Sequence, residues 1–214
     1  AIVGLPVYAG RLPNLLLNYL TTWQSNGAWA VPVVVYGNRS YGNALVELYD
    51  ILRYRGFHPI AAAAFVGQHS FTTRLATGRP DREDLEKAEQ FSAEIVRRIL
   101  QPGEFTGIKI PGQGAPDYGG YYKPKGRDEE VVNFLKAKPV TTNACIDSRR
   151  CAKVCPMGAI RLDHPSEVSG ICIKCNACVK QCPVHAKQLT DEAYLSHVGF
   201  LENRYTSRAR IELF

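Results

Sequence analysis

The first hundred residues alternate between two patterns of apolar and polar positions. Three short runs are almost wholly apolar, as in strands buried on both faces of a parallel sheet, and they cover 1–7, 31–36 and 57–66. The stretches beside them carry apolar residues at helical spacing, over 12–25, 44–54 and 81–100. Strand and helix thus alternate three times with short connections, which predicts a doubly wound α/β sheet in a first domain at 1–101.

The loops that follow the three predicted strands share a composition. They combine glycine with aromatic, amide or basic side chains, and they cover 8–11, 37–41 and 67–71. In a doubly wound sheet, ligands bind beyond the carboxyl ends of the strands, where these loops meet. Each loop alone is ordinary turn chemistry, but three such loops at one edge favour a cofactor site.

The rest of the chain divides into three parts. Residues 102–139 form a connector rich in glycine, proline and tyrosine, with a short helix expected over 128–137. A cysteine-bearing domain follows at 140–190, and its length of about fifty residues is too small to rely on an apolar core alone. Residues 191–214 contain most of a helix expected over 189–201 and a basic extension, which is either a strap over the larger domain or a loose tail.

All seven cysteines lie beyond residue 144, and four of them form one run. Cys172, Cys175, Cys178 and Cys182 have the spacing C-x2-C-x2-C-x3-C-P, which is the spacing of bacterial ferredoxins that hold two iron–sulfur clusters. Three thiolates spaced three residues apart can each reach one corner of a compact cluster, and the fourth turns toward a neighbouring cluster. The run therefore predicts a partner run elsewhere in the chain.

The partner run lies upstream, with one ligand position changed. Cys151 and Cys155 align with the end of the motif, which puts Cys145 at the first ligand position and Ser148 at the second. The last cysteine of each run is expected to cross to the other cluster. The first 4Fe-4S set is then Cys155, Cys172, Cys175 and Cys178, and the second set has three thiolates, from Cys145, Cys151 and Cys182.

Three outcomes are open at the incomplete second site. In one, Ser148 binds the fourth iron as an alkoxide, although a hydroxyl deprotonates far less readily than a thiol. In another, Asp147 or a water fills that corner. In the third, the fourth iron is absent and the second cluster is 3Fe-4S rather than 4Fe-4S.

Two other uses of cysteine fit this spacing less well. Structural zinc needs two C-x2-C pairs, or one such pair with histidines, and has no use for a third cysteine at the same spacing and two Cys-Pro ends. Disulfides are disfavoured because seven is an odd number, we expect no secretory segment, and three cysteines within seven residues cannot all pair. Iron–sulfur chemistry is therefore the leading interpretation.

Three segments together with the cysteine region carry a family resemblance. They are Gly-Leu-Pro-Val-Tyr-Ala-Gly-Arg-Leu-Pro-Asn at 4–14, Val-Val-Val-Tyr-Gly-Asn-Arg-Ser-Tyr at 33–41 and Gly-Gln-His-Ser-Phe at 67–71. The chain resembles the family in which a flavodoxin-like domain is fused to a bacterial-type ferredoxin, and the match extends to Phe-Leu-Glu-Asn-Arg-Tyr at 200–205. This resemblance implies a flavodoxin-like doubly wound parallel sheet plus a small α+β ferredoxin-like domain with two clusters.

The same resemblance implies FMN on the first domain and electron transfer between flavin and clusters. By position, one side of the isoalloxazine ring is expected to contact Tyr8, Ala9, Gly10 and Arg11, and the other side Gly37, Asn38, Arg39 and Tyr41. The chain departs from the family pattern because it matches only from the third strand of a flavodoxin-like sheet onward, without the phosphate loop after the first strand. We expect roughly two strands and a helix to precede residue 1 in the native protein, and FMN binding to be poor without them. Residues 1–7 would otherwise form an exposed apolar edge.

Charge and composition narrow the expected partners. The formal net charge is +6, but ligating thiolates offset part of it, and no base-stacking platform accompanies the basic residues, which disfavours nucleic acid. No apolar run reaches the length of a membrane span, and thiolate centres without an export signal indicate a reducing cytoplasm. The expected function is an electron carrier that serves redox partner proteins. The rival is a flavin-dependent reductase of a small organic substrate, and no catalytic nucleophile with its base is expected.

Overall fold

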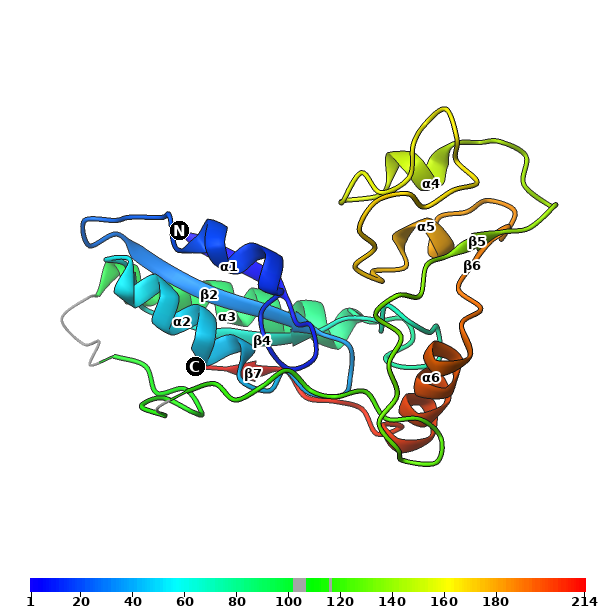
Figure 1. The fold of residues 1–214 in the computed structure, drawn as a ribbon. Helices are drawn as coiled ribbons and strands as arrows, with labels where there is room; N and C mark the ends of the chain where they lie inside the picture. Colours follow the sequence, from blue (N-terminus) through cyan, green and yellow to red (C-terminus); the bar gives the residue numbers. More distant parts are fainter. Residues whose placement is uncertain (102–106, 116) are drawn as a thin grey trace. The chain divides into compact units, whose positions relative to one another are not determined.

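The computed structural model describes residues 1–101, 107–115 and 117–214. The chain forms two compact units, each built from separate segments (Figure 1). The sheet unit consists of Ala1–His69, Arg74–Tyr122 and Tyr205–Phe214, and the cysteine unit consists of Ser70–Thr73 and Lys123–Arg204. The expected connector is thus shared between the two units, and the end of the chain returns to the first.

The sheet unit is built on a mixed β-sheet. β1 (Ile2–Pro6), β2 (Trp29–Tyr36) and β4 (Ala63–Val66) are parallel neighbours in that order, and β7 (Glu212–Leu213) adds antiparallel to β4. β3 (His58–Pro59) pairs with the start of β2. The run predicted as one strand over 57–66 is therefore two strands. Between them, Ala62 exchanges both backbone hydrogen bonds with Phe214, at 2.9 and 3.1 Å.

Helices cover both faces of this sheet. α1 (Asn14–Leu20) and α2 (Ala44–Tyr54) pack on one face, where Val34 and Ala64 lie in their apolar cluster. α3 (Arg82–Leu100) packs on the other face, where Phe91 and Ile95 contact the cluster of Val31 and Ala63. Side chains at neighbouring positions along a strand thus point to opposite faces of the sheet, and helices cover both faces. The continuous apolar runs predict this burial on both faces. The unit has the α/β architecture expected from the periodicity, and β1 is the edge strand, with Ile2 exposed.

The basic extension is a strap, not a loose tail. The amide of the buried Asn38 donates from Nδ2 to the carbonyls of Tyr205 and Ser207, at 2.8 and 2.9 Å, and its Oδ1 accepts from the Ala209 N–H at 3.1 Å. Residues 205–214 thereby reach β4, where β7 extends the sheet. One buried amide satisfies three backbone groups of a segment that has no helix of its own.

The cysteine unit has little regular structure. β5 (Val140–Thr141) and β6 (Lys187–Gln188) form a two-stranded antiparallel sheet, and α4 (Arg150–Lys153) and α5 (Ala177–Lys180) are single turns. α6 (Glu192–Arg204) packs through Tyr194 against Phe134 and Phe71. The helix predicted over 128–137 is wrong. Glu129 has a left-handed φ of 65°, and the Gly126 N–H donates to Glu130, which makes a turn there instead.

Candidate metal centres

Two halves of the cysteine unit have matching backbones. The segments 145–160 and 172–187 place α4 and α5 at equivalent points, and each short helix follows a left-handed residue, Arg149 or Asn176. Left-handed φ values recur at two further equivalent pairs, which are Asp147 with Lys174 and Gly158 with His185. The sequence shows the repeat only through its cysteines. The structure extends it to the turns that hold them.

Each Cys-Pro end holds its sulfur in the same way. The Ala159 N–H donates to Cys155 Sγ at 3.3 Å, and the Ala186 N–H donates to Cys182 Sγ at 3.2 Å. Backbone N–H groups aimed at a sulfur favour its anionic form. At Cys182, burial raises the pKa of the thiol, but the N–H groups of residues 184–187 outweigh it and lower the pKa overall.

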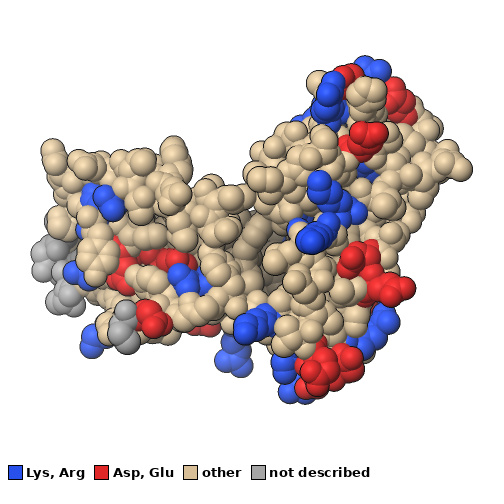
Figure 2. All heavy atoms as spheres, viewed as in Figure 1, with Lys and Arg blue, Asp and Glu red and all other residues tan. Residues whose placement is uncertain are grey.

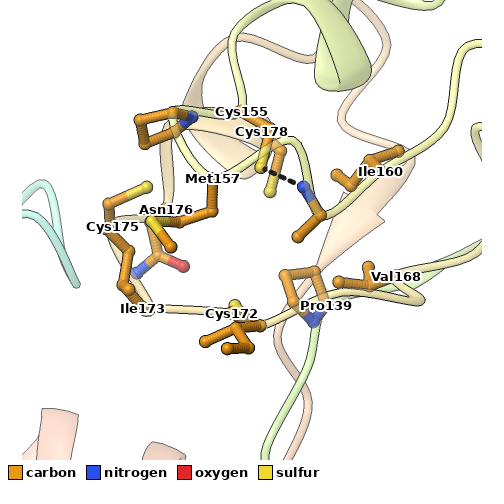
Figure 3. A pocket seen from close by; sticks show the side chains of 13 residues that line it. Pro139, Cys155, Met157, Ile160, Val168, Cys172, Ile173, Cys175, Asn176 and Cys178 are labelled. Atoms are coloured by element: carbon orange, nitrogen blue, oxygen red, sulfur yellow. Dashed lines mark hydrogen bonds between the residues drawn. The ribbon is translucent and has the colours of Figure 1, made fainter. Parts of the chain in front are cut away.

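The first hollow collects the complete set of four cysteines. Cys172, Cys175 and Cys178 from the second half line it together with Cys155 from the first half. Figure 3 shows Cys155 beside Cys178, with Cys172 across the hollow from them. Apolar side chains complete the wall, among them Ile160 and Val168. The crossed arrangement predicted from the spacing is the one that the backbone adopts here.

The four thiols of the first hollow interact electrostatically. The pKa of Cys178 is raised to about 11, mainly by burial and in addition by the neighbouring Cys175, Cys172 and Cys155, because thiolates close together repel one another. Four thiolates in this apolar enclosure need a cation between them. Without one, Cys178 is a protonated thiol at neutral pH.

One amide oxygen at the wall of the first hollow lacks a hydrogen-bond partner among the described residues. Asn176 is 5% exposed and lines the hollow, and its Nδ2 donates to the Tyr194 hydroxyl at 2.6 Å. Its Oδ1 is buried without a hydrogen-bond partner among the described residues. Buried polar atoms in folded proteins nearly always have a partner, which can be an ordered water.

The second hollow collects the incomplete set. Cys145, Cys151 and Cys182 line it together with Ser148, so crossing holds here as well. Its volume of about 20 Å³ equals that of the first hollow, so serine in place of cysteine has not closed the site. Asp147 is not part of the lining. Its carboxylate accepts from Arg149 at 3.2 and 3.3 Å and is exposed, so Ser148 is the better placed oxygen.

The cysteines are not arranged as a site for a single metal ion. Within residues 1–101, 107–115 and 117–214, no three His, Cys, Asp or Glu side chains are placed to hold one metal ion together. The thiols instead stand around two hollows, and all seven cysteines are free of disulfides. No family model, curated protein or solved structure matches this chain.

The loops at the carboxyl ends of the strands lie against one another. The Asn43 N–H donates to the Gly10 carbonyl at 2.9 Å, and a Cβ on Gly42 would come within 2.5 Å of that oxygen. A Cβ on Gly37 would lie 2.6 Å from the His69 ring, which belongs to the third loop. Glycine is required at both approaches, so these three loops meet at one edge as predicted from their order.

Four of the side chains predicted to contact flavin are engaged by protein groups. Arg11 forms a two-point ion pair with the buried Glu47, at 2.7 and 2.9 Å, and Tyr41 donates to Glu212 at 2.7 Å. Asn38 holds the strap. The first loop is a tight turn in which Tyr8 and Arg11 pair, with Ala9 and Gly10 both left-handed. Arg39 stacks on the ring of Tyr122 at 3.9 Å.

Four buried charges were missed at the sequence level, which are Glu47, Lys187 and the ion pair of Arg79 with Asp84. Glu47 lies on the apolar face of the helix predicted over 44–54 and is buried. A charged residue among apolar ones on that face was the sequence feature that could have indicated a buried ion pair. Lys187 is 2% exposed and lines the second hollow. It occupies the position of Ile160 in the repeat, and this exchange of an apolar for a basic residue could have been read from the aligned halves.

Proposed function

We propose that this protein transfers electrons through two iron–sulfur centres, one at each hollow. The observation that carries the proposal is the crossing itself. Cys155 joins Cys172, Cys175 and Cys178, while Cys182 joins Cys145 and Cys151. Two separate enclosures, each lined by cysteines from both halves, fit the ligand pattern of paired clusters and have no use in a single zinc site.

The residues present fit such clusters in three respects. Backbone N–H groups point at Cys155 and Cys182, the hollows are apolar enough to limit water, and the left-handed turns let successive cysteines face inward. A bound cluster would supply one-electron exchange without proton transfer. The protein would set its reduction potential through ligand identity, hydrogen bonds to sulfur and burial.

We further propose an FMN at the carboxyl edge of the sheet unit, in the manner of a flavodoxin-like domain fused to a ferredoxin-like one. The close approach of the loops at this edge supports this placement. A flavin takes two electrons and can release them singly to one-electron centres. Arg11 and Asn38 would act there by shaping the loops rather than by touching the ring.

The proposal extends to the protein's setting. Redox partner proteins in a reducing cytoplasm are the proposed donors and acceptors, since free thiols persist under reducing conditions. No helix within the described ranges is long and apolar enough to cross a membrane. On the face drawn in Figure 2, Lys and Arg side chains are interspersed with Asp and Glu, which is not the single-sign surface that favours nucleic acid.

Anaerobic purification with iron, sulfide, zinc and FMN analysis tests the proposal. About eight irons per chain indicate two 4Fe-4S clusters, and about seven indicate a 4Fe-4S with a 3Fe-4S. About four irons indicate one cluster and remove the second centre from the proposal. A colourless protein containing zinc overturns it. Bleaching of bound flavin by a small organic substrate alone, without a partner protein, would assign a reductase instead of a carrier.

A further inference from the structure

A buried lysine lies at the wall of the second hollow. Lys187 is in β6, paired with Thr141 of β5, and 2% of its surface is exposed. Its Nζ donates to Thr141 Oγ1 at 2.5 Å, to the Pro165 carbonyl at 2.8 Å and to the Ser166 carbonyl at 3.0 Å. An ammonium has three N–H donors, and each of them has an oxygen acceptor here.

Packing alone does not require a charged side chain at the position of Lys187. Ile160 occupies the equivalent position of the other half, is also buried, and lines the first hollow. The two enclosures therefore share a backbone but differ at several wall positions, among them Asn176 against the exposed Arg149, and two of the differences involve a ligand position or a buried charge. The first has Ile160 and Cys175, and the second has Lys187 and Ser148.

The positive charge lines the same hollow as the thiols of the second set, and its field also reaches Cys178 of the first set. The carbonyl oxygen of Pro165 contacts both Lys187 Nζ, at 2.8 Å, and Cys151 Sγ, at 3.6 Å. Lys187 also lines the same enclosure as Cys145 and Cys182. Charges at such separations interact strongly when both are buried, because protein screens them less than water does.

Both differences act in the same direction. A thiolate replaced by serine removes negative charge from the second centre, and a buried ammonium adds positive charge beside it. Adding an electron there costs less free energy than at the first centre, which has four thiolates in an apolar wall. A centre's net charge is one of the properties that set its potential.

We infer that Lys187 raises the reduction potential of the second centre above that of the first, so that the second centre holds the electron at equilibrium. The inference rests on the proposed function. One electron is added, and no bond is made or broken. Lys187 is thus a positioned charge that directs electron flow from the Cys172 side to the Cys145 side.

A redox titration of the full chain, reduced stepwise with dithionite and followed by electron paramagnetic resonance, tests the inference. A Cys151→Ala variant loses the signal of the second centre and so assigns it. In the wild type, the second centre is expected to be reduced first. In Lys187→Met, its reduction equilibrium should fall at least tenfold, which is about 59 mV for one electron, and the first centre should move less.

Two variants separate charge from structure. Lys187→Arg keeps the charge and should retain most of the wild-type potential, whereas Lys153→Met removes an exposed lysine of α4 and should change neither centre. Equal shifts in Lys187→Met and Lys187→Arg would mean that packing, not charge, is responsible, and would overturn the inference.

Failure of the inference is distinguishable from failure of the proposed function. A wild-type protein without cluster iron removes the function. A wild-type protein with both clusters, in which the first centre is reduced before the second or together with it, leaves the function standing and overturns the role of Lys187. This wild-type ordering decides the question even if Lys187→Met loads only one cluster.

Discussion

Ser148 and Cys175 occupy the same place in the two halves of the cysteine unit. Each stands between two left-handed residues, Asp147 and Arg149 in one half and Lys174 and Asn176 in the other, and each lines its own hollow. The backbone at Ser148 therefore presents its side chain to the second hollow as the backbone at Cys175 does to the first. At this position the halves differ only in the side-chain atom, which is oxygen in Ser148 and sulfur in Cys175.

Restoring a thiol at this place should complete the second centre. We predict that Ser148→Cys raises the iron content from about seven to about eight per chain and lowers the potential of the second centre, because a thiolate adds negative charge. Iron analysis and an electron paramagnetic resonance titration measure both effects. Asp147→Ala is the matched control and should change neither, since this exposed carboxylate is bonded to Arg149. A rise in potential in Ser148→Cys would show that the serine already binds iron as an alkoxide.

If ligation is crossed, alanine substitutions at the equivalent positions Cys155 and Cys182 should each abolish a different centre. Cys155→Ala should abolish the first centre, although Cys155 belongs to the run that supplies the second, and Cys182→Ala should abolish the second. Each variant should retain the spectrum of the other centre. If Cys155→Ala instead removes the signal that Cys151→Ala removes, each run binds its own cluster and the proposed ligand sets are wrong.

The sequence reveals structure that depends on local residue spacing, but not structure that depends on contacts between distant segments. The cysteine spacing fixes short turns, so the grouping of the cysteines around two hollows follows from the motif. The helix predicted over 44–54 matches α2 because its apolar spacing is local. The three acceptors of Lys187 come from two separate segments, Thr141 and residues 165–166. The spacing of apolar and polar residues along the chain carries no information about contacts between such distant segments. The helix wrongly predicted over 128–137 failed for the same reason, since the bridge between Lys125 and Val131 overrides local preference.

The Arg11–Glu47 pair should stabilise the sheet unit rather than bind a ligand. Glu47 accepts from Arg11 at two points and also from the Leu12 N–H at 3.0 Å, and its side chain is 3% exposed. Arg11→Met would leave a buried carboxylate without its countercharge, and we predict a loss of about 3 kcal/mol in the free energy of unfolding. Urea titration of the metal-free protein, followed by the fluorescence of Trp23 and Trp29, reports this unit because both tryptophans lie in it.

An exposed ion pair of the same unit is the control for Arg11. Arg82 and Glu86 pair across one turn of α3 with their side chains 94% and 54% exposed. Arg82→Met should cost less than about 0.5 kcal/mol, as is usual for such pairs. Losses of equal size in the two variants would contradict the assignment of Arg11 to the buried framework, and tighter FMN binding to wild type than to Arg11→Met at equal stability would assign it to the flavin site.

Asp84 should make the sheet unit sensitive to acid. Its hydrogen bonds from Arg79, at 2.5 and 2.7 Å, are the main cause that lowers its pKa, and burial opposes them. A carboxyl group whose pKa is lower in the folded state than its unfolded value of about 3.9 stabilises the fold above that pH. The stabilisation disappears as the pH falls through the folded value. The free energy of unfolding should therefore decline below about pH 4.

Asp84→Asn should remove the pH-dependent contribution of Asp84 to the free energy of unfolding and leave the other contributions unchanged. At neutral pH the variant is expected to be less stable than the wild type, because Arg79 loses its buried countercharge. As the pH falls from 6 to 2, the difference should shrink, since the wild-type carboxylate becomes protonated and loses the same interaction. Asp163→Asn changes the charge equally in the cysteine unit, where Arg161 lowers the pKa of Asp163 to about 2, and should not alter the tryptophan-detected transition. Parallel wild-type and Asp84→Asn curves over this range would show that the Asp84 contribution comes from its cap of α3 through Asp81 and not from its charge.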